Sequence, residues 1–271
     1  MAEHDEDFEE AVADVAREGK PEFEPEEAQV FARSLRVLNE TGIPYVVGGA
    51  FAKHAYTGVW RDTKDLDIFL KPGDLKPALD ALKAAGYETE VEFEHWLAKA
   101  RHAPYFIDLI FGTGHGQLQV DDTWFKYSQP VEIAGVRTRL IPIEELIVSK
   151  AYIAERYRFD GADVAHLIRG AKGVIAWSRV LERLGPNREL LLWQLILFDF
   201  IYPGHSDYLP KELMVQLFEQ ARERWSNPQA NRKAFRGTLL DPFSFIVDVE
   251  DWGYEDRRDL EPLVNDEGEP V

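Results

Sequence analysis

The sequence predicts an α/β (α+β) fold, in which helices flank a small mixed β-sheet and a helical region follows toward the C-terminus. Short β-branched and apolar runs alternate with amphipathic runs up to about residue 141. From residue 142 onward, apolar residues recur at helical spacing in several successive segments. No linker rich in Ser, Pro or Gly separates the two halves, so we expect them to pack as one body.

A helix and a strand are expected before a pair of glycines. EEAQVFARSLRVLNE (26–40) spaces its apolar residues along one face of a helix, and TGIP ends it. YVVG (45–48) is short and β-branched, which is typical of a strand. GAFAKHAYTG (49–58) is rich in small residues, so we expect a short helix packed closely on that strand, with Gly58 as its exit.

Further strands complete the expected sheet. LDIFL (66–70) is the next strand, and DLKPALDALKAAG (74–86) is an amphipathic helix that ends at a glycine. YETEVEFEHWLAKA (87–100) and PYFIDLIFG (104–112) indicate more strands, and VEIAGVRTRLI (131–141) is expected to form a hairpin.

Helices are expected in most of the remaining chain, at 142–158, 160–172, 175–185, 189–200 and 210–225. The predicted organisation is therefore an acidic N-terminal tail (1–26), an α/β core (27–141), a helical region packed on the core (142–240) and an acidic C-terminal tail (241–271).

The net charge of −18 is concentrated at the two ends of the chain. Residues 1–29 carry a net charge of −10 and residues 248–271 carry −8, so the residues between them, with 27 acids and 27 bases, are neutral. Acidic ends of this kind are typical of solvated tails. The neutral body does not exclude a polyanion such as tRNA, but its scattered Lys and Arg residues outline no nucleic-acid footprint.

Cysteine is absent, which excludes disulfides, a thiol nucleophile and thiolate metal sites. A metal would have to be held by oxygen or imidazole, which favours a hard cation. MAEHDEDFEE lacks the basic and apolar regions of a signal peptide, and the longest apolar run (190–202) is too short for a membrane span and contains Asp199. We expect a cytoplasmic protein with no membrane partner.

Two acids, Asp65 and Asp67, stand one residue apart where a strand is expected to begin. In a chain with 49 acids such a spacing arises about nine times by chance, and Glu92 and Glu94 form one such pair. Side chains two apart on a strand share a face, with Cα atoms about 6.6 Å apart. Asp108 would join them if its strand lay alongside, about 4.8 Å away. Three converging carboxylates indicate a divalent cation such as Mg²⁺.

Gly48 and Gly49 lie at the predicted turn from strand to helix. Two glycines there would let backbone N–H groups approach a phosphate closely, and the start of the helix favours an anion. Tight packing of the helix on the strand is an equal alternative for these glycines. Phosphate on one side and a cation on the other together indicate a nucleoside triphosphate site. His54, on the short helix, is expected to be packed or solvated rather than catalytic.

The runs VVGGAFAKHAYTGVWRDTKDLDIFL and FIDLIFG resemble the nucleotidyltransferases of the DNA polymerase β superfamily, whose signature is a Gly-Gly or Gly-Ser turn, an Asp-x-Asp pair and a third Asp. The match is closest to the bacterial minimal and abortive-infection-type branches, in which Arg-x-Thr precedes the pair as Arg61 and Thr63 do here. ELIVSKAYIAERYRFDGADVAHL resembles the helical Lys…Arg…Asp segment of the same branches. The resemblance spans roughly residues 30–170.

This resemblance implies a role for each matching residue. Asp65 and Asp67 would bind two Mg²⁺ ions, or Mn²⁺, that bridge the triphosphate. Asp108 would complete the second metal site and help to accept the proton of the acceptor hydroxyl. Gly48 and Gly49 would hold the β and γ phosphates.

Arg61 and Lys150 would add further contacts to the nucleotide or its phosphates. Thr63, Arg156 and Asp163 are additional candidates for the site. A helix-surface ion pair of Arg156 with Asp160 or Asp163 is an equal alternative to a direct role.

The predicted function is metal-dependent transfer of a nucleoside monophosphate from a nucleoside triphosphate to an acceptor hydroxyl, with release of pyrophosphate. The acceptor could be a small molecule, a protein or a tRNA. The alternative is a non-catalytic nucleotide-binding protein, or one member of a toxin–antitoxin pair with an antitoxin-type partner. A metal-dependent phosphohydrolase is a weaker third alternative.

Overall fold

The computed structural model describes residues 24–60, 63–228 and 231–261. The chain divides into two compact units. The described part of the α/β unit comprises residues 24–60, 63–142 and 259–261, and that of the helical unit lies within 143–258. Most of the predicted N-terminal tail and the last ten residues of the predicted C-terminal tail lie outside the described residues.

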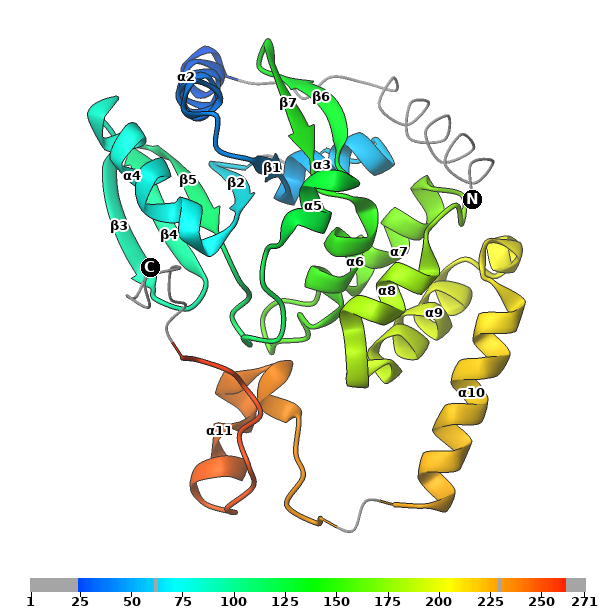
Figure 1. Ribbon diagram of the computed structural model, residues 1–271. Coiled ribbons are helices and arrows are strands. Elements are labelled where there is room, and N and C mark those ends of the chain that lie inside the picture. The colour runs from blue at the N-terminus through cyan, green and yellow to red at the C-terminus, as the bar shows by residue number, and fades with distance from the viewer. Residues whose placement is uncertain (1–23, 61–62, 229–230, 262–271) are drawn as a thin grey trace. The chain divides into compact units, whose positions relative to one another are not determined.

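The α/β unit contains a seven-stranded mixed sheet with the order β3-β4-β5-β2-β1-β7-β6 (Figure 1). The strands are β1 (Tyr45–Val47), β2 (Asp65–Leu70), β3 (Glu88–Phe93), β4 (Leu97–His102), β5 (Tyr105–Ile110), β6 (Gln129–Ile133) and β7 (Val136–Leu140). β2 runs parallel to β5, and β1 runs parallel to β7, whereas the other neighbours are antiparallel. The predicted α/β class and the mixed sheet are confirmed.

The helices of this unit are α2 (Pro25–Thr41), α3 (Gly49–Thr57), α4 (Leu75–Ala84) and α5 (Asp122–Lys126). α2 begins at a capping box formed by Glu24 and Glu27, and it ends at Gly42, whose φ of 73° is favourable for glycine. α2 buries Phe31 and Leu35 completely. α3 follows β1 directly, and this short connection brings the start of α3 next to the adjacent strand β2.

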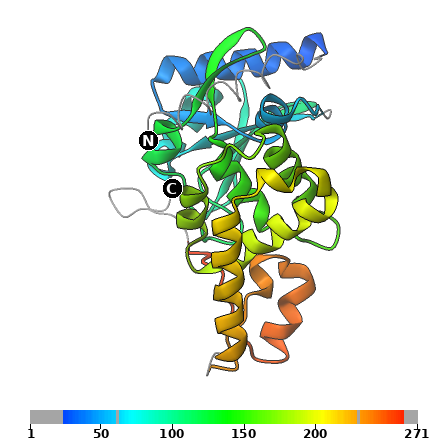
Figure 2. The ribbon, with the colours of Figure 1, turned by 90° about the vertical axis from the view of Figure 1, so that its right-hand side faces the viewer.

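The helical unit contains α6 (Ile143–Ala151), α7 (Gly161–Gly170), α8 (Trp177–Leu184), α9 (Glu189–Ile201), α10 (Lys211–Ser226) and α11 (Pro242–Glu250). α10 can be followed lengthwise in Figure 2. The prediction of one helix over 142–158 is wrong, since α6 ends at Ala151. Beyond it, Glu155 and Arg158 exchange backbone hydrogen bonds, which closes a tight turn instead of another helical turn. None of the helices in the described part of the chain is long and apolar enough to cross a membrane.

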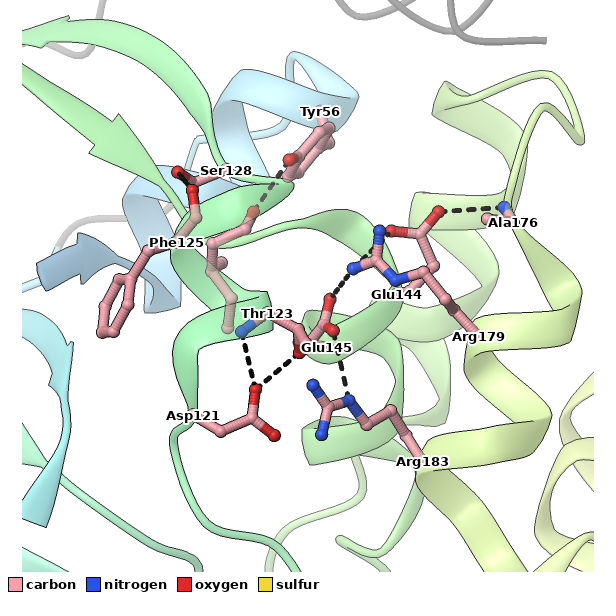
Figure 3. A network of polar contacts seen from close by, with 11 residues as sticks. Tyr56, Asp121, Thr123, Phe125, Ser128, Glu144, Glu145, Ala176, Arg179 and Arg183 are labelled. Atoms are coloured by element: carbon pink, nitrogen blue, oxygen red, sulfur yellow. Dashed lines mark hydrogen bonds and ion pairs between the residues drawn. The ribbon is translucent and has the colours of Figure 1, made fainter. Parts of the chain in front are cut away.

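A cluster of buried charges joins α6 to α8 within the helical unit (Figure 3). Glu145 has no exposed surface and forms ion pairs with Arg179 and Arg183. The adjacent Glu144, which is 2% exposed, accepts a hydrogen bond of 2.9 Å from the amide of Ala176. Burial raises the pKa of Glu144, and the nearby Arg179 opposes that increase. These ion pairs and hydrogen bonds replace the hydrogen bonds to water that the two carboxylates lose when they are buried.

Replacing Glu145 with alanine is expected to lower the free energy of unfolding by about 3–5 kcal/mol, because two partly buried guanidinium groups lose their counter-charge. Chemical denaturation followed by circular dichroism measures this change. Glu182→Ala, at an exposed position of α8, is the control and should change the free energy by less than about 0.5 kcal/mol. Equal effects of the two substitutions would contradict a stabilising role for the cluster.

Candidate functional site

The sheet brings Asp65, Asp67 and Asp108 together. β2 and β5 are parallel neighbours, and Asp67 lies directly opposite Asp108 in their register. One carboxylate oxygen from each residue of the triad lies within 4.8 Å of the other two, and all three residues are half-buried. β5, which carries Asp108, therefore lies alongside β2, which carries Asp65 and Asp67. This is the arrangement that the predicted convergence of the three acids needs.

Asp108 is partly buried and lies close to other charged side chains. Burial raises the pKa of Asp108, the nearby Lys99 opposes this increase, and the charges of Asp65 and Glu92 add to it. The hydroxyl of Thr63 donates a hydrogen bond to Asp65 Oδ1, which fixes one oxygen of that carboxylate. Three acids with these neighbours can hold a cation, because the donor set consists of oxygen atoms that already converge.

Lys99, on β4, is a member of this site that the sequence did not reveal. It lies opposite Asp108 in the register of β4 and β5, and its Nζ is 3.3 Å from Asp108 Oδ1. The same ammonium is 3.4 Å from Glu92 Oε2 on β3. The sequence contained a signal, because acids alternate along β3 and Lys99 and Arg101 alternate along β4, as in cross-strand ion pairs. The spacing of Glu92 and Glu94 alone does not distinguish this role from a chance pair of acids.

Both glycines of the turn lie where α3 approaches β2 closely. A Cβ atom on Gly48 would lie 2.3 Å from a ring carbon of Phe69, and one on Gly49 would lie 1.6 Å from Asp67 Oδ2. The amide of Gly48 donates a hydrogen bond of 2.9 Å to the carbonyl oxygen of Asp67. These contacts account for the glycines by close packing, and the Gly49 contact also brings the first turn of α3 to the carboxylate of Asp67. Phosphate binding by these residues stays a prediction.

Lys150, at the C-terminal end of α6 in the helical unit, is held by two acids. Its Nζ is 3.0 Å from Asp160 Oδ2 and 2.7 Å from Asp163 Oδ2, and the residue is 8% exposed. Burial tends to raise the pKa of Asp160, but hydrogen bonds and charge from Arg158 and Lys150 outweigh burial and lower it. Asp163 and Lys150, both predicted site residues, are thus joined to each other.

Arg156 and Arg61 complete the predicted set. Arg156 is exposed, its amide donates a hydrogen bond of 2.9 Å to Asp241 Oδ2, and its guanidinium lies 5.4 Å from the ring centroid of Tyr157. The alternative of an ion pair between Arg156 and Asp160 or Asp163 is not what the described residues show, because Asp160 pairs with Lys150 and Arg158, and Asp163 pairs with Lys150. Arg61 lies outside the described residues.

Two histidines of the α/β unit are packed. His54, on α3, is 8% exposed, and its ring lies edge-on to that of Trp60 with centroids 5.6 Å apart, as expected for a packed rather than a catalytic histidine. His115, after β5, is 9% exposed, and its Nδ1 accepts a hydrogen bond of 3.1 Å from the amide of Gln117. Burial lowers the pKa of His115 from 6.5 to about 4.

This pKa shift predicts how acid affects stability. The folded-state pKa of His115 is below its unfolded value, so its contribution is complete above pH 6.5 and is lost as the pH falls from 6.5 toward 4. The free energy of unfolding should fall by up to about 3 kcal/mol across this range. Denaturant titrations at several pH values measure it. His115→Gln should flatten the profile, whereas the control His102→Gln, at an exposed site on β4, should preserve it. Identical profiles for both variants would contradict the assignment.

The chain is similar to known proteins both in sequence and in structure. A family model described as "Uncharacterised nucleotidyltransferase" matches residues 29–193, which is more than half of the chain. No curated protein matches the sequence. The structure is similar to that of the antibiotic-resistance factor ANT(2'')-Ia, with 15% identity, a TM-score of 0.44, and coverage of 68% of this chain and 100% of the other.

Two further solved structures resemble it. The lincosamide antibiotic adenylyltransferase LnuA has 15% identity and a TM-score of 0.40, with coverage of 57% of this chain and 99% of that one. An antigenic nucleotidyltransferase-like protein from Paracoccidioides brasiliensis has 14% identity and a TM-score of 0.43, with coverage of 68% and 92%. At such identities and TM-scores these likenesses carry no argument about function. The family match confirms the resemblance to nucleotidyltransferases, and the chain belongs to this nucleotidyltransferase family.

Proposed function

We propose that the protein is a metal-dependent nucleotidyltransferase, which moves a nucleoside monophosphate from a nucleoside triphosphate to an acceptor hydroxyl and releases pyrophosphate. The observation that carries this proposal is the convergence of Asp65, Asp67 and Asp108 to within 4.8 Å across two parallel strands. Membership of the nucleotidyltransferase family supports the reaction class. A complete triad favours catalysis over the non-catalytic alternative, because a protein without turnover would be free to lose at least one of the three acids.

The donor set suits Mg²⁺ or Mn²⁺. All three ligating groups are carboxylates, and hard divalent cations prefer such oxygen ligands. Burial and the neighbouring carboxylates raise the pKa of Asp108, so the cluster is costly in its fully ionised form and a cation would relieve that cost. When bound, the metal would neutralise charge on the phosphates and stabilise the entering and leaving oxygens.

The three carboxylates of the triad would have different roles in the reaction. Asp65 and Asp67 would position the metal-bound triphosphate, and the hydroxyl of Thr63 would hold Asp65 in the required orientation. Asp108 would complete the metal site and accept the proton of the acceptor hydroxyl.

The first turn of α3 would contribute to phosphate binding. Gly49 has a φ of 55°, and its lack of a side chain lets this turn reach the carboxylate of Asp67. Amides at the start of a helix favour an anion, so a phosphate held at Asp67 would meet them. Gly48 and Gly49 would thus act through the backbone. Arg61 and Lys150 are proposed as further nucleotide contacts, with Arg156 and Asp163 as supporting residues.

Several finer predictions rest on the sequence alone. They are the abortive-infection-type branch, a cytoplasmic location, the division into core, helical region and acidic tails, and an antitoxin-type partner. The acceptor is a small molecule, a protein or a tRNA.

The decisive experiment incubates the protein with each α-³²P-labelled nucleoside triphosphate, Mg²⁺ and a cell extract. Label in the protein, RNA or small-molecule fraction would identify both the donor and the acceptor class. The Asp67→Asn variant serves as the blank, so label that persists with this variant is not due to the proposed site. Absence of label in every fraction with all four nucleotides would favour the non-catalytic alternative.

A further inference from the structure

A row of charged side chains crosses the sheet at the carboxylate triad. Lys99 on β4 lies opposite Asp108 on β5, and Asp108 lies opposite Asp67 on β2. Directly opposite residues of neighbouring strands project from the same face of a sheet. The lysine and the two acids therefore form one continuous line on the face that carries the proposed reaction.

The ammonium group of Lys99 is held in place from three sides. It lies 3.3 Å from Asp108 Oδ1, 3.4 Å from Glu92 Oε2 and 4.8 Å from the ring centroid of Phe106. The side chain of Lys99 is only 14% exposed. A lysine on an open surface would move freely, whereas this one has a defined position next to the third acid.

We propose that Lys99 is the built-in counter-ion of Asp108 and that it limits how tightly the carboxylate triad binds a divalent cation. This inference rests on the proposed function, since it assumes that the triad holds the metal. Lys99 acts through Asp108 and is a positioning residue, without contact with the substrate. Its ammonium is paired with Oδ1 of Asp108.

The direction of the effect follows from Coulomb's law. Three ionised carboxylates carry a charge of −3, and one ammonium beside them reduces the charge felt by an incoming cation. A divalent cation bound to Asp108 would lie within a few ångströms of the Lys99 ammonium, and that repulsion weakens its binding. Removing the lysine charge should therefore tighten binding, by roughly tenfold at the effective dielectric of a partly exposed site.

Lys99→Met tests this with the full-length chain, because methionine preserves the unbranched apolar stem beside Phe106 and removes the charge. Binding of Mn²⁺ without nucleotide is measured by electron paramagnetic resonance of the free ion at pH 8, with folding verified by circular dichroism. The variant should bind Mn²⁺ roughly tenfold more tightly than the natural protein. Lys99→Arg retains the charge and should restore the natural affinity.

Arg101→Met is the matched control. Arg101 lies two residues further along β4 and forms ion pairs with Glu90 and Glu92. It forms no ion pair with Asp108 among the described residues and acts on that carboxylate only through a longer-range Coulombic interaction, so its loss should change Mn²⁺ affinity much less than the loss of Lys99. An equal gain in affinity for the Arg101 and Lys99 variants would reduce the effect to general surface charge and overturn the proposal.

The Asp67→Asn variant distinguishes a failure of the proposed metal site from a failure of the proposed role of Lys99. If natural protein and Asp67→Asn bind Mn²⁺ equally well, the proposed metal site itself is wrong. If Asp67→Asn loses Mn²⁺ and Lys99→Met binds with unchanged or weaker affinity, the metal site stands and the counter-ion role of Lys99 is overturned.

Discussion

Asp67→Asn is expected to abolish nucleotidyl transfer, with a loss of at least about a thousandfold, while the fold stays intact. A loss of this size corresponds to roughly 4 kcal/mol of transition-state stabilisation. The amide keeps the size of the carboxylate but removes its charge, so the oxygen that faces Asp108 across the parallel strands becomes a poor metal ligand. Asp65→Asn should behave in the same way, because its carboxylate belongs to the same convergent set.

The same substitution, Asp67→Asn, should not lower the stability of the fold. Removing one of three neighbouring carboxylates relieves repulsion in the metal-free protein, so the thermal unfolding midpoint should be unchanged or higher. Glu94→Gln, at an exposed position between β3 and β4, is the control for loss of one acid and should retain full activity. Full metal-dependent activity of Asp67→Asn, measured as pyrophosphate release with the identified acceptor, would remove the basis of the site assignment.

Gly49→Ala is expected to cost at least about a hundredfold in activity, because the added methyl group would occupy the space of the Asp67 carboxylate. The new Cβ would lie 1.6 Å from Oδ2 and 2.6 Å from Cγ of Asp67, so that side chain would have to leave its position. A displacement of about 1 Å in a positioning group can cost a hundredfold in rate. The φ of 55° adds backbone strain of about 1–2 kcal/mol for any residue with a Cβ.

Gly42→Ala separates strain from site damage. Gly42 has a φ of 73° at the end of α2, and a Cβ there would meet nothing within 4 Å. This variant should lose about 1–2 kcal/mol of stability from strain alone and keep its activity. Both variants are assayed below their unfolding midpoints for transfer and for Mn²⁺ binding. Retention of both properties by Gly49→Ala would contradict the close approach of α3 to Asp67.

Local chemistry predicted most of the elements. The alternating and apolar runs gave β2 and β5, and glycines end α2 and α3, where φ values of 73° and 70° require little strain only for glycine. The helix predicted over 142–158 ends at Ala151. Lys150, in its last turn, pairs with Asp160 and Asp163, and the backbone hydrogen bonds between Glu155 and Arg158 turn the chain back between them.

The sequence alone could not decide the role of Gly48 and Gly49. The sequence allowed either phosphate binding or close packing for Gly48 and Gly49, since both uses need a residue without a side chain. The packed neighbours, the ring of Phe69 and the carboxylate of Asp67, lie about twenty residues further along the chain. No local pattern could identify them.

The sequence by itself determined the fold class and the three acids, because an Asp-x-Asp pair on a strand must share a face and a buried acid requires a partner. Only the tertiary structure decided that β4 supplies Lys99 to the same row. Strand order and register arise from pairing between distant segments, and a shift of one residue would turn Lys99 to the opposite face of the sheet. The sequence thus pointed to the three acids, and the register of β4, β5 and β2 placed the charge of Lys99 beside them.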